Sequence, residues 1–384
     1  MNTQTSKTVC VALTLLTGLA ATAAGMKSTT AEPAEIEAGA VFRDIAYTLP
    51  KDAPYVNVRD KGAVGDGQTD DTAAIQAAID ATHNAWEVVY LPAGIYLVSD
   101  TVRWKRFLTF RGEGPGKTVI KLTDNAPGFG NPAKPKPVVF CRRIVDPDKN
   151  NNTSHSNHIY HLSVEVGAGN PGAIGIDYTS HNGGTLKDVV IRAADGSGTV
   201  GVACDRNAPG PALVKNVSVH GFDYGFTTRW GLYSMTYENI TAQGQRKAGF
   251  WNRAHPACIR GFHSINKVPA VKVADNRDYG LLILLDSVLE GGAAENAAIE
   301  SEGEIFVRNV DTDGYQAAIR DDDRTVAGPY VNEYSSTPLL TPSGDPGTSL
   351  NLPILDTPTV PWETDPDEWV NVRNFEHHKK GDAW

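Results

Sequence analysis

A repeat of about 23 residues in the middle of the chain constrains the fold more than any other feature of the sequence. Six segments share a polar or small residue followed by alternating apolar positions, as in KDVVIRA and KNVSVHG, and these anchors lie 28, 23, 23, 24 and 23 positions apart. Such a period marks a solenoid, and short segments with Gly, Asn and Asp turns favour strands. The sequence therefore predicts a β-solenoid with anchors at Asp188, Asn216, Asn239, Phe262, Asp286 and Asn309.

Two columns of side chains follow from this period, because alternate residues of a strand share a face. The third residue after each anchor is expected to stack inward as an apolar ladder: Ile191, Val219, Ala242, Ile265, Leu289 and Thr312. The fourth residue is polar in all six segments and is expected to point outward as one stripe: Arg192, His220, Gln243, Asn266, Glu290 and Asp313.

The ordered part of the chain is expected to begin at Tyr55, where alternating valines predict a strand and GAVGDG predicts a turn. Thr69 is suited to cap a helix with Asp70 and Asp71 in its first turn. The buried stripe of this helix is expected to be Ile75, Ala78, Ile79 and Thr82. Turn formation and helix capping account for the nearby acids, including Asp66, without a metal site.

The two ends of the chain predict different kinds of segment. Residues 1–23 have a single basic residue, a short apolar run and a small-x-small site, which is typical of a secretory signal peptide and predicts a secreted or periplasmic protein. Residues 24–51 are expected to form a loose lead-in, 52–325 the solenoid and 326–367 a Pro-rich linker. Residues 368–384 repeat the YVNVR phrase as WVNVR, which predicts the start of a second, truncated β-helix repeat.

Composition excludes some partners. The formal net charge of −10 argues against a nucleic acid or a membrane surface, because such contacts are built from clustered Lys and Arg. After signal cleavage the remaining cysteines are Cys141, Cys204 and Cys258, which are expected to be single buried thiols. No cysteine or histidine spacing predicts a zinc site, no cofactor is indicated, and calcium is left open without a specific motif.

The opening of the ordered region resembles a known family. The phrases VNVRDKGAVGDGQTDDTAAIQAAID, VVYLPAGIYLVSDTV and RGEGPGKTVIKL look like the start of the pectate-lyase superfamily. The resemblance is specific over residues 55–122 and extends to about Arg320 in architecture alone. It implies an all-β, single-stranded, right-handed parallel β-helix with a short capping helix, and a polysaccharide substrate. The superfamily includes rhamnogalacturonase-like and polygalacturonase-like hydrolases, epimerases, phage tailspikes and two-helix exo-β-1,3-glucanases.

Catalytic residues of these relatives cannot be carried over. The Asn-Thr-Asp, Asp-Asp, Gly-His-Gly and Arg-Ile-Lys set of the polygalacturonases is not found in this sequence, nor is the calcium-binding arrangement of the best-known lyases. In the two-helix glucanases the cleft lies between the helices and the second helix supplies the acid. If this chain resembles the first half of such an enzyme, it implies a second β-helix partner and little activity alone.

The stripe itself supplies a candidate site where it becomes acidic. Glu290 and Asp313 occupy equivalent places on neighbouring rungs, and Asp311 lies on the same face, so one carboxyl is expected to hold its proton near neutrality. Carboxyls in two protonation states are what glycosidic cleavage requires. The groove is expected to bind sugars through Arg192, His220, Gln243 and Asn266, together with Arg229 and Trp230 from a nearby aromatic-rich segment.

Several functions remain open from the sequence. The favoured hypothesis is an exported glycoside hydrolase that acts on a pectic or β-1,3-glucan type polysaccharide by carboxylate acid/base catalysis. The alternatives are a polysaccharide lyase or epimerase, and a non-catalytic glycan-binding or structural β-helix. Four stripe residues precede glycine, namely His220, Gln243, Glu290 and Asp313, so the stripe is equally readable as the polar entry to a repeated turn.

Overall fold

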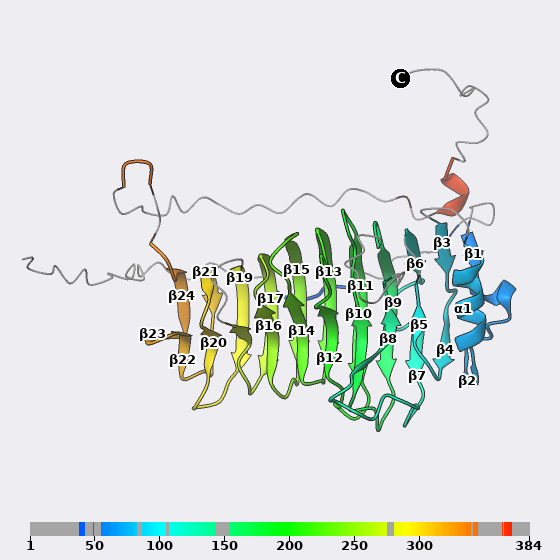
Figure 1. The fold of residues 1–384 in the computed structure, drawn as a ribbon, viewed down its shortest axis with the longest axis horizontal. Helices are drawn as coiled ribbons and strands as arrows, with labels where there is room; N and C mark the ends of the chain where they lie inside the picture. The colour runs from blue at the N-terminus through cyan, green and yellow to red at the C-terminus, as the bar shows by residue number, and fades with distance from the viewer. Residues whose placement is uncertain are drawn as a thin grey trace, which may run out of the picture.

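The computed structural model describes residues 38–42, 49, 55–82, 87–104, 107–142, 154–274, 280–338, 341–344, 363 and 365–370. Over these ranges the chain winds into a parallel β-helix in which each strand pairs with its counterpart one rung later (Figure 1). Two sheets form its walls. The predicted fold class is confirmed.

The larger wall, called sheet A, has fourteen strands. They are β1 (Tyr55–Asn57), β2 (Asp66–Asp70), β3 (Glu87–Tyr90), β4 (Gly94–Val98), β6 (Leu108–Arg111), β7 (Thr118–Leu122), β9 (His158–Val166), β11 (Thr185–Ala193), β13 (Ala212–His220), β15 (Met235–Gln243), β17 (Ala257–Asn266), β19 (Leu281–Gly291), β21 (Glu304–Asp311) and β24 (Tyr330–Ser335).

The smaller wall, called sheet B, has ten shorter strands. They are β5 (Val102–Arg103), β8 (Lys136–Phe140), β10 (Ala173–Asp177), β12 (Val200–Cys204), β14 (Tyr224–Arg229), β16 (Ala248–Arg253), β18 (Val271–Val273), β20 (Ala297–Ser301), β22 (Ala317–Asp321) and β23 (Arg324–Val326). From β9 onward each rung passes once through sheet A and once through sheet B, whereas the earlier rungs contribute two short strands each to sheet A, such as β6 and β7, which both pair with β9.

A column of left-handed residues bends the long strands of sheet A. Asn and Asp tolerate positive φ better than other side chains, because their short polar groups bond locally. Asn216 donates to Asp188 at 2.9 Å and Asn309 donates to Asp286 at 2.8 Å, so neighbouring rungs are also tied at this bend. The column consists of His161, Asp188, Asn216, Asn239, Gly261, Asp286 and Asn309, with φ between 46° and 69°.

These bends explain why the anchors could be found in the sequence. Five of the six predicted anchors lie in the column, and the sixth, Phe262, is displaced by Gly261, which takes the left-handed position. A side chain at Gly261 would approach the Asn239 carboxamide oxygen to 2.4 Å, so only glycine fits there. Because the bend lies one residue earlier than predicted, the residues after it in β17 take the opposite faces: Ser264 lies in the inward column and Ile265 in the outward one.

The core is a ladder of apolar side chains between the two sheets. The inward positions of Ile191, Val219, Ala242 and Leu289 are fully buried as predicted, and Thr312 is 1% exposed. Ser264, not Ile265, takes the inward place in β17. Aromatic rings fill the middle rungs, with centroid separations of 5.0 Å for Tyr237 and Phe250, and 6.1 Å for Phe226 and Phe250.

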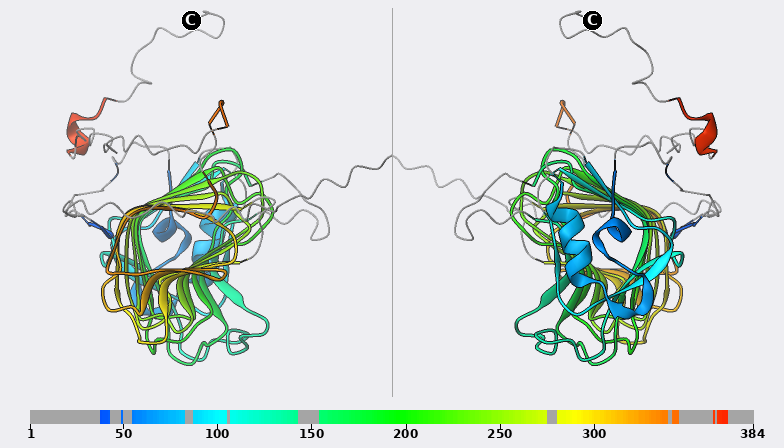
Figure 2. Two further views of the ribbon diagram at one scale, coloured as in Figure 1. Left: turned by 90° about the vertical axis from the view of Figure 1, so that its left-hand side faces the viewer. Right: turned by 90° about the vertical axis from the view of Figure 1, so that its right-hand side faces the viewer.

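The N-terminal end carries the short helices η1 (Val58–Lys61) and α1 (Thr72–Asp80) (Figure 2). Helix α1 begins at Thr72 with Asp71 as its N-cap, not at Thr69, which lies in β2. Ile75, Ala78 and Ile79 are buried, as expected, whereas Thr82, the fourth predicted member of the stripe, follows the helix and is only partly buried.

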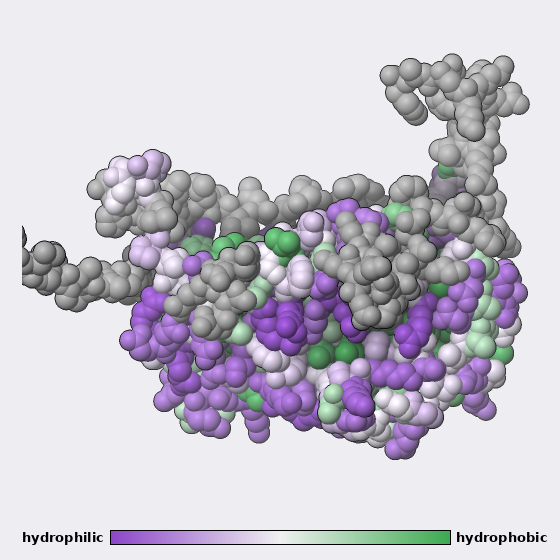
Figure 3. Space-filling view, viewed as in Figure 1, coloured by the Kyte–Doolittle hydropathy of each residue, from purple (hydrophilic) through white to green (hydrophobic). Residues whose placement is uncertain are grey.

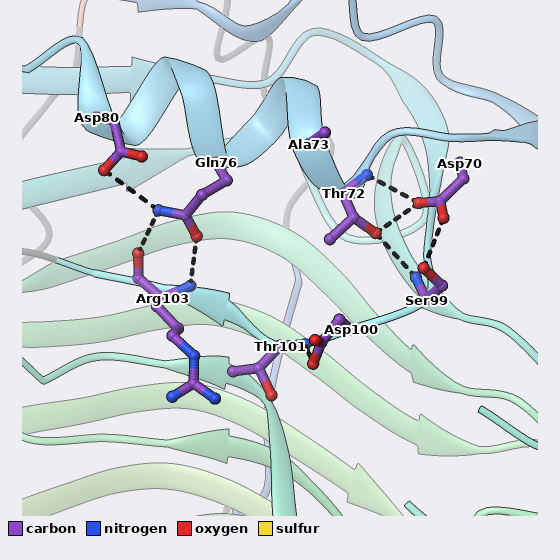
Figure 4. A pocket seen from close by; sticks show the side chains of 9 residues that line it. All are labelled: Asp70, Thr72, Ala73, Gln76, Asp80, Ser99, Asp100, Thr101 and Arg103. Carbon is purple, nitrogen blue, oxygen red and sulfur yellow. Dashed lines mark hydrogen bonds between the residues drawn. The ribbon is translucent and has the colours of Figure 1, made fainter. Parts of the chain in front are cut away.

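The three nearby acids all accept local hydrogen bonds. The Asp70 carboxyl bonds to Thr72 and Ser99 beside an open pocket at this end (Figure 4). Asp66 accepts from two turn amides and Asp71 from the Val64 and Gly65 amides. These contacts match the turn role predicted for the acids, but Asp70 and Asp71 precede the first turn of α1, and the Asp71 side chain makes no cap hydrogen bond to the helix.

Segments at both ends depart from the predicted boundaries. Residues 38–42, within the expected lead-in, lie against sheet A, where the Gly39 amide donates to Gly261 at 2.8 Å and the Ala40 amide donates to Thr241 at 2.9 Å. At the other end β24 pairs antiparallel with β21, so sheet A reaches Ser335 inside the expected linker. The predicted signal peptide and residues 371–384 of the second repeat lie outside the described residues.

The face shown in Figure 3 is mostly hydrophilic with small hydrophobic patches. Among the described residues, no helix is long and apolar enough to span a membrane. Cys141 and Cys204 are buried free thiols and Cys258 is a half-buried one, close to the prediction for all three.

Candidate active site on sheet B

The predicted polar stripe is present on the outer face of sheet A, where Arg192, His220, Gln243 and Glu290 share one column. His220 contacts Ser218 Oγ at 2.7 Å through Nε2 and Gln243 Oε1 at 3.2 Å through Nδ1. Burial, and then the charge of Arg192, lower the pKa of His220, so the imidazole is neutral at pH 7.

Asn266 is not on this stripe, contrary to the prediction. The left-handed bend at Gly261 moves Ile265 to the outward place and turns Asn266 inward, where it is 3% exposed. Its amide donates to Ala242 O at 3.2 Å and to Ser264 Oγ at 2.9 Å, and its carbonyl accepts from the Gln245 amide at 2.6 Å. Asn266 therefore stabilises the rung from within.

The predicted acidic trio is less compact than the repeat suggested. Glu290 pairs with His263, a residue that the sequence did not single out, at 2.8 Å. The ladder between β19 and β21 ends at Val288 and Asp311, so Asp313 lies beyond the paired strands, and its amide donates to Asp311 at 3.1 Å. The catalytic role of these three acids stays a prediction.

Arg229 and Trp230, the other predicted sugar-binding residues, lie far along the rung from that stripe, at the end of β14 in sheet B. Arg229 is exposed and is the Cα partner of Arg253 on β16. Sequence reasoning therefore grouped residues that belong to two different walls.

Several charged side chains and one aromatic ring lie near the ends of neighbouring strands of sheet B, where Arg229 is next to Arg253. The set, called the sheet-B cluster, comprises Arg142, Asp177, Asp205, Arg206, Trp251 and Arg253. Asp177 ends β10 and its side chain is 3% exposed, whereas its partner Arg206 is 45% exposed. Arg206 donates to one oxygen of Asp177 at 2.8 and 3.0 Å.

The second acid of the cluster is held in a similar way. Asp205 follows β12 directly, one rung after Asp177, and pairs with Arg253 at 2.5 Å. Thr227 donates to the same Asp205 oxygen at 2.9 Å, whereas the other oxygen is buried with no partner in the described structure. The Arg253 guanidinium also lies 4.4 Å from the Trp251 ring centroid, which fixes its orientation.

The charges in this cluster are unevenly balanced. Burial raises the pKa of the Asp177 carboxyl, and the charge and hydrogen bonds of Arg206 oppose that rise. Burial, followed by the nearby charge of Arg206, lowers the pKa of the half-buried Arg142 guanidinium. The three arginines of the cluster therefore outnumber its two carboxyls, Asp177 and Asp205.

An open groove of about 610 Å³ continues from Trp251 toward later rungs of sheet B. Its floor holds Glu300, which pairs with Arg320 at 3.1 Å and with Lys272 at 3.3 Å. Trp251, Lys272, Glu300 and Arg320 share one column of the sheet. In this column the carboxyl of Glu300 lies between the cations Lys272 and Arg320.

Sheet B was missed in the sequence because its strands are short and lack alternation. A usable signal was present in Gly175, Gly201, Gly225 and Gly249, which are spaced 26, 24 and 24 residues apart and each precede a buried apolar residue. A side chain at Gly201 would approach Val219 of β13 to 2.2 Å, so a glycine within this strand of sheet B lets it pack closely against sheet A. Asp177 and Asp205 follow two of them closely.

No three His, Cys, Asp or Glu side chains gather closely enough to hold a metal ion in the part of the chain that the structure describes. The prediction about calcium stays open.

Comparison with known proteins decides the family. The family model described as rhamnogalacturonase A/epimerase, pectate lyase-like matches residues 55–261, more than half of the chain. The chain belongs to this family. The predicted resemblance to pectate-lyase-like β-helices is thereby confirmed.

Individual relatives and solved structures match parts of the chain that differ in length. Mannuronan C5-epimerase AlgE3 of Azotobacter vinelandii is 51% identical over 78 residues, 18% of this chain and 4% of that protein. Glucan 1,3-beta-glucosidase of Cochliobolus carbonum is 28% identical over 155 residues, 40% of this chain and 18% of that protein. The chain thus spans less than a fifth of either relative. The Agl-KA catalytic domain covers 72% of this chain and 56% of its own at 16% identity, with a TM-score of 0.49.

Proposed function

We propose that this protein is a polysaccharide-acting glycoside hydrolase whose active site is the sheet-B cluster. The observation that carries the proposal is the pair of carboxyls on consecutive rungs, Asp177 and Asp205, each held by an arginine on the same open face. Hydrolysis of a glycosidic bond uses two carboxyls with different protonation states. Family membership supports a carbohydrate substrate.

The substrate is proposed to carry negative charge. The cluster holds three arginines, Arg142, Arg206 and Arg253, against two carboxyls, Asp177 and Asp205, so its net positive charge would attract a further anion. Guanidinium groups bind carboxylates through paired hydrogen bonds, which suits the carboxylate of a uronic acid. The names of two matched relatives, a mannuronan epimerase and an alginate lyase, also refer to acidic polymers.

The two carboxyls are proposed to divide the chemistry. Asp205 is 27% exposed, whereas Asp177 is 3% exposed, so the more accessible Asp205 is placed as the base or nucleophile. Asp177 is placed as the proton donor, since burial already raises its pKa. When Arg206 turns to the sugar carboxylate, Asp177 loses its counter-charge, its pKa rises further and its proton is retained for the leaving oxygen.

The surplus of arginines favours one second candidate, proton abstraction next to the sugar carboxylate, as in a lyase or an epimerase. Neutralising that carboxylate makes the neighbouring C–H group more acidic. The products separate the reactions, because a hydrolase gives new reducing ends, a lyase gives an unsaturated ultraviolet-absorbing end, and an epimerase leaves chain length unchanged.

The test incubates the purified protein with polymannuronate, polygalacturonate and β-1,3-glucan, and compares Asp205→Asn and Asp177→Asn with wild type. Each substitution should lower kcat/KM by about 100-fold or more, the range lost with a general acid or base. Asp223→Asn is the matched control, since Asp223 is an arginine-paired acid on the same sheet outside the cluster.

A second pair of variants tests the alternative site on sheet A. Glu290→Gln and Asp313→Asn should retain activity; loss there, with activity kept in Asp205→Asn, would return the active site to the stripe. No product from the wild type on any of the three polymers would refute the enzymatic proposal.

The cellular setting belongs to the same proposal. The predicted signal peptide supports secretion or periplasmic export, where polymeric substrates are found. Activity in the culture medium or periplasm, and its disappearance when residues 1–23 are deleted, checks this. A second β-helix remains a proposed partner, and its addition should not be needed for cleavage if the sheet-B cluster is complete.

A further inference from the structure

The loop from Arg229 to Ser234 presents apolar side chains to solvent beside the sheet-B cluster. Leu232 is 54% exposed and Tyr233 is 47% exposed. Trp230 and Tyr233 both have positive φ, at 103° and 65°, which is rare for bulky residues. Strained backbone of this kind persists only where the surroundings hold it, and it concentrates at binding sites.

A buried histidine holds the loop in this conformation. His255 is fully buried, and its Nδ1 contacts the carbonyl oxygen of Trp230. Asn252 fixes His255 in turn, since its amide donates to His255 O at 2.8 Å and its carbonyl accepts from the His255 amide at 2.9 Å. The exposed loop is therefore anchored to the rung below it before any ligand arrives.

A shallow pocket of about 450 Å³ lies next to this loop. Segments from three successive rungs line this pocket, at residues 182–184, 211–213 and 234–236. Two of these rungs are in close contact, because a Cβ added at Gly210 would lie 2.7 Å from the Tyr233 carbonyl oxygen. The lining combines apolar groups with hydroxyl and amide groups: Asn182, Pro211, Leu213, Ser234 and Thr236.

We propose that Leu232, Tyr233 and this pocket form a sugar-stacking subsite that binds polysaccharide units beyond the cleavage point. The inference rests on the proposed function, and it adds a neutral platform to a charged catalytic cluster. Sugar rings have apolar C–H faces that pack on exposed aromatic rings, and hydroxyl rims that bond to Asn, Ser and Thr. The loop follows directly after Arg229, the neighbour of Arg253 in the sheet-B cluster, so a polysaccharide bound at the cluster could extend onto the loop.

Chain length distinguishes this subsite from the catalytic cluster. Tyr233→Ala and Leu232→Ser should lower kcat/KM about tenfold on long polymannuronate, yet change it less than about twofold on trimers too short to span both regions. Ile95→Ser is the matched control, because Ile95 is 44% exposed and lies in β4, near the N-terminal end of the β-helix and away from the loop. Melting temperatures should stay equal, since all three side chains are exposed.

Binding without turnover gives an independent readout. Titration of wild type, Tyr233→Ala and Ile95→Ser with the polymer should show about tenfold weaker binding only for Tyr233→Ala. Equal binding and equal rates on long chains would overturn the subsite even if cleavage at Asp205 is established. Loss of self-association in Tyr233→Ala would instead make the loop a protein contact and also overturn it. If wild type neither binds nor cleaves any polymer, the subsite fails together with the proposed function.

Discussion

Replacing Asn266 with alanine separates a structural role from a sugar-binding one. The side chain makes three internal hydrogen bonds, and its removal leaves the buried Gln245 amide without an acceptor. An unsatisfied buried polar group costs about 1–3 kcal/mol, whereas Ser264 and Ala242 retain other options. The free energy of unfolding should therefore fall by about 2–4 kcal/mol.

The assay combines urea unfolding with steady-state kinetics. Asn266→Ala should unfold at lower urea, while KM per folded molecule stays at the wild-type value. Asn296→Ala is the control, because Asn296 donates a single surface hydrogen bond to Lys267 at 2.8 Å and its loss should cost about 1 kcal/mol or less. A raised KM with unchanged urea midpoint would refute the structural reasoning and restore Asn266 to the substrate groove.

Two further predictions concern stability. Burial lowers the pKa of His181 to about 4 from its ordinary 6.5, so its stabilising contribution is present above pH 6.5 and is lost as the pH falls toward 4. Thermal melts across this window should show a shallower loss for His181→Gln than for wild type; parallel curves would contradict it. Gly201→Ala should lower the melting temperature sharply because its Cβ would lie 2.2 Å from Val219, whereas Gly130→Ala meets nothing within 4 Å and should leave it unchanged.

The rung repeat was predictable because one backbone requirement recurs at a fixed place. The left-handed bend selects Asn or Asp at most rungs, and these residues are visible in a sequence. The same logic failed at β17, where Gly261 meets the requirement and leaves Phe262 as a misleading anchor. Counting from Phe262, one residue too late, the prediction put Asn266 on the outer face and left Ser264 out of the inward ladder, although both side chains are buried.

The candidate site was harder to predict, because its members come from separate turns. Arg206 and Arg253 are 47 positions apart, and nothing in their local sequence indicates that each pairs with an acid on an earlier rung. Asp177 stands out because burial raises its pKa, and this burial exists only once the two walls have assembled, so it cannot be seen in the local sequence. Strand β24 lies inside the predicted linker because the rung pattern ends near Arg324 and many prolines follow from Pro338 on, so one more antiparallel strand left no repeat signal.

The antiparallel strands at the far end have a mechanical consequence. In a solenoid each rung contacts only its neighbours, so fraying starts at the termini and travels inward. Asp321, fully buried, receives hydrogen bonds from Arg324 and from Tyr334, which joins the last rung of sheet B to the last strand of sheet A. This contact joins the two walls at the last rung, so fraying from this end has to break the hydrogen bond between Tyr334 and Asp321 before the walls separate.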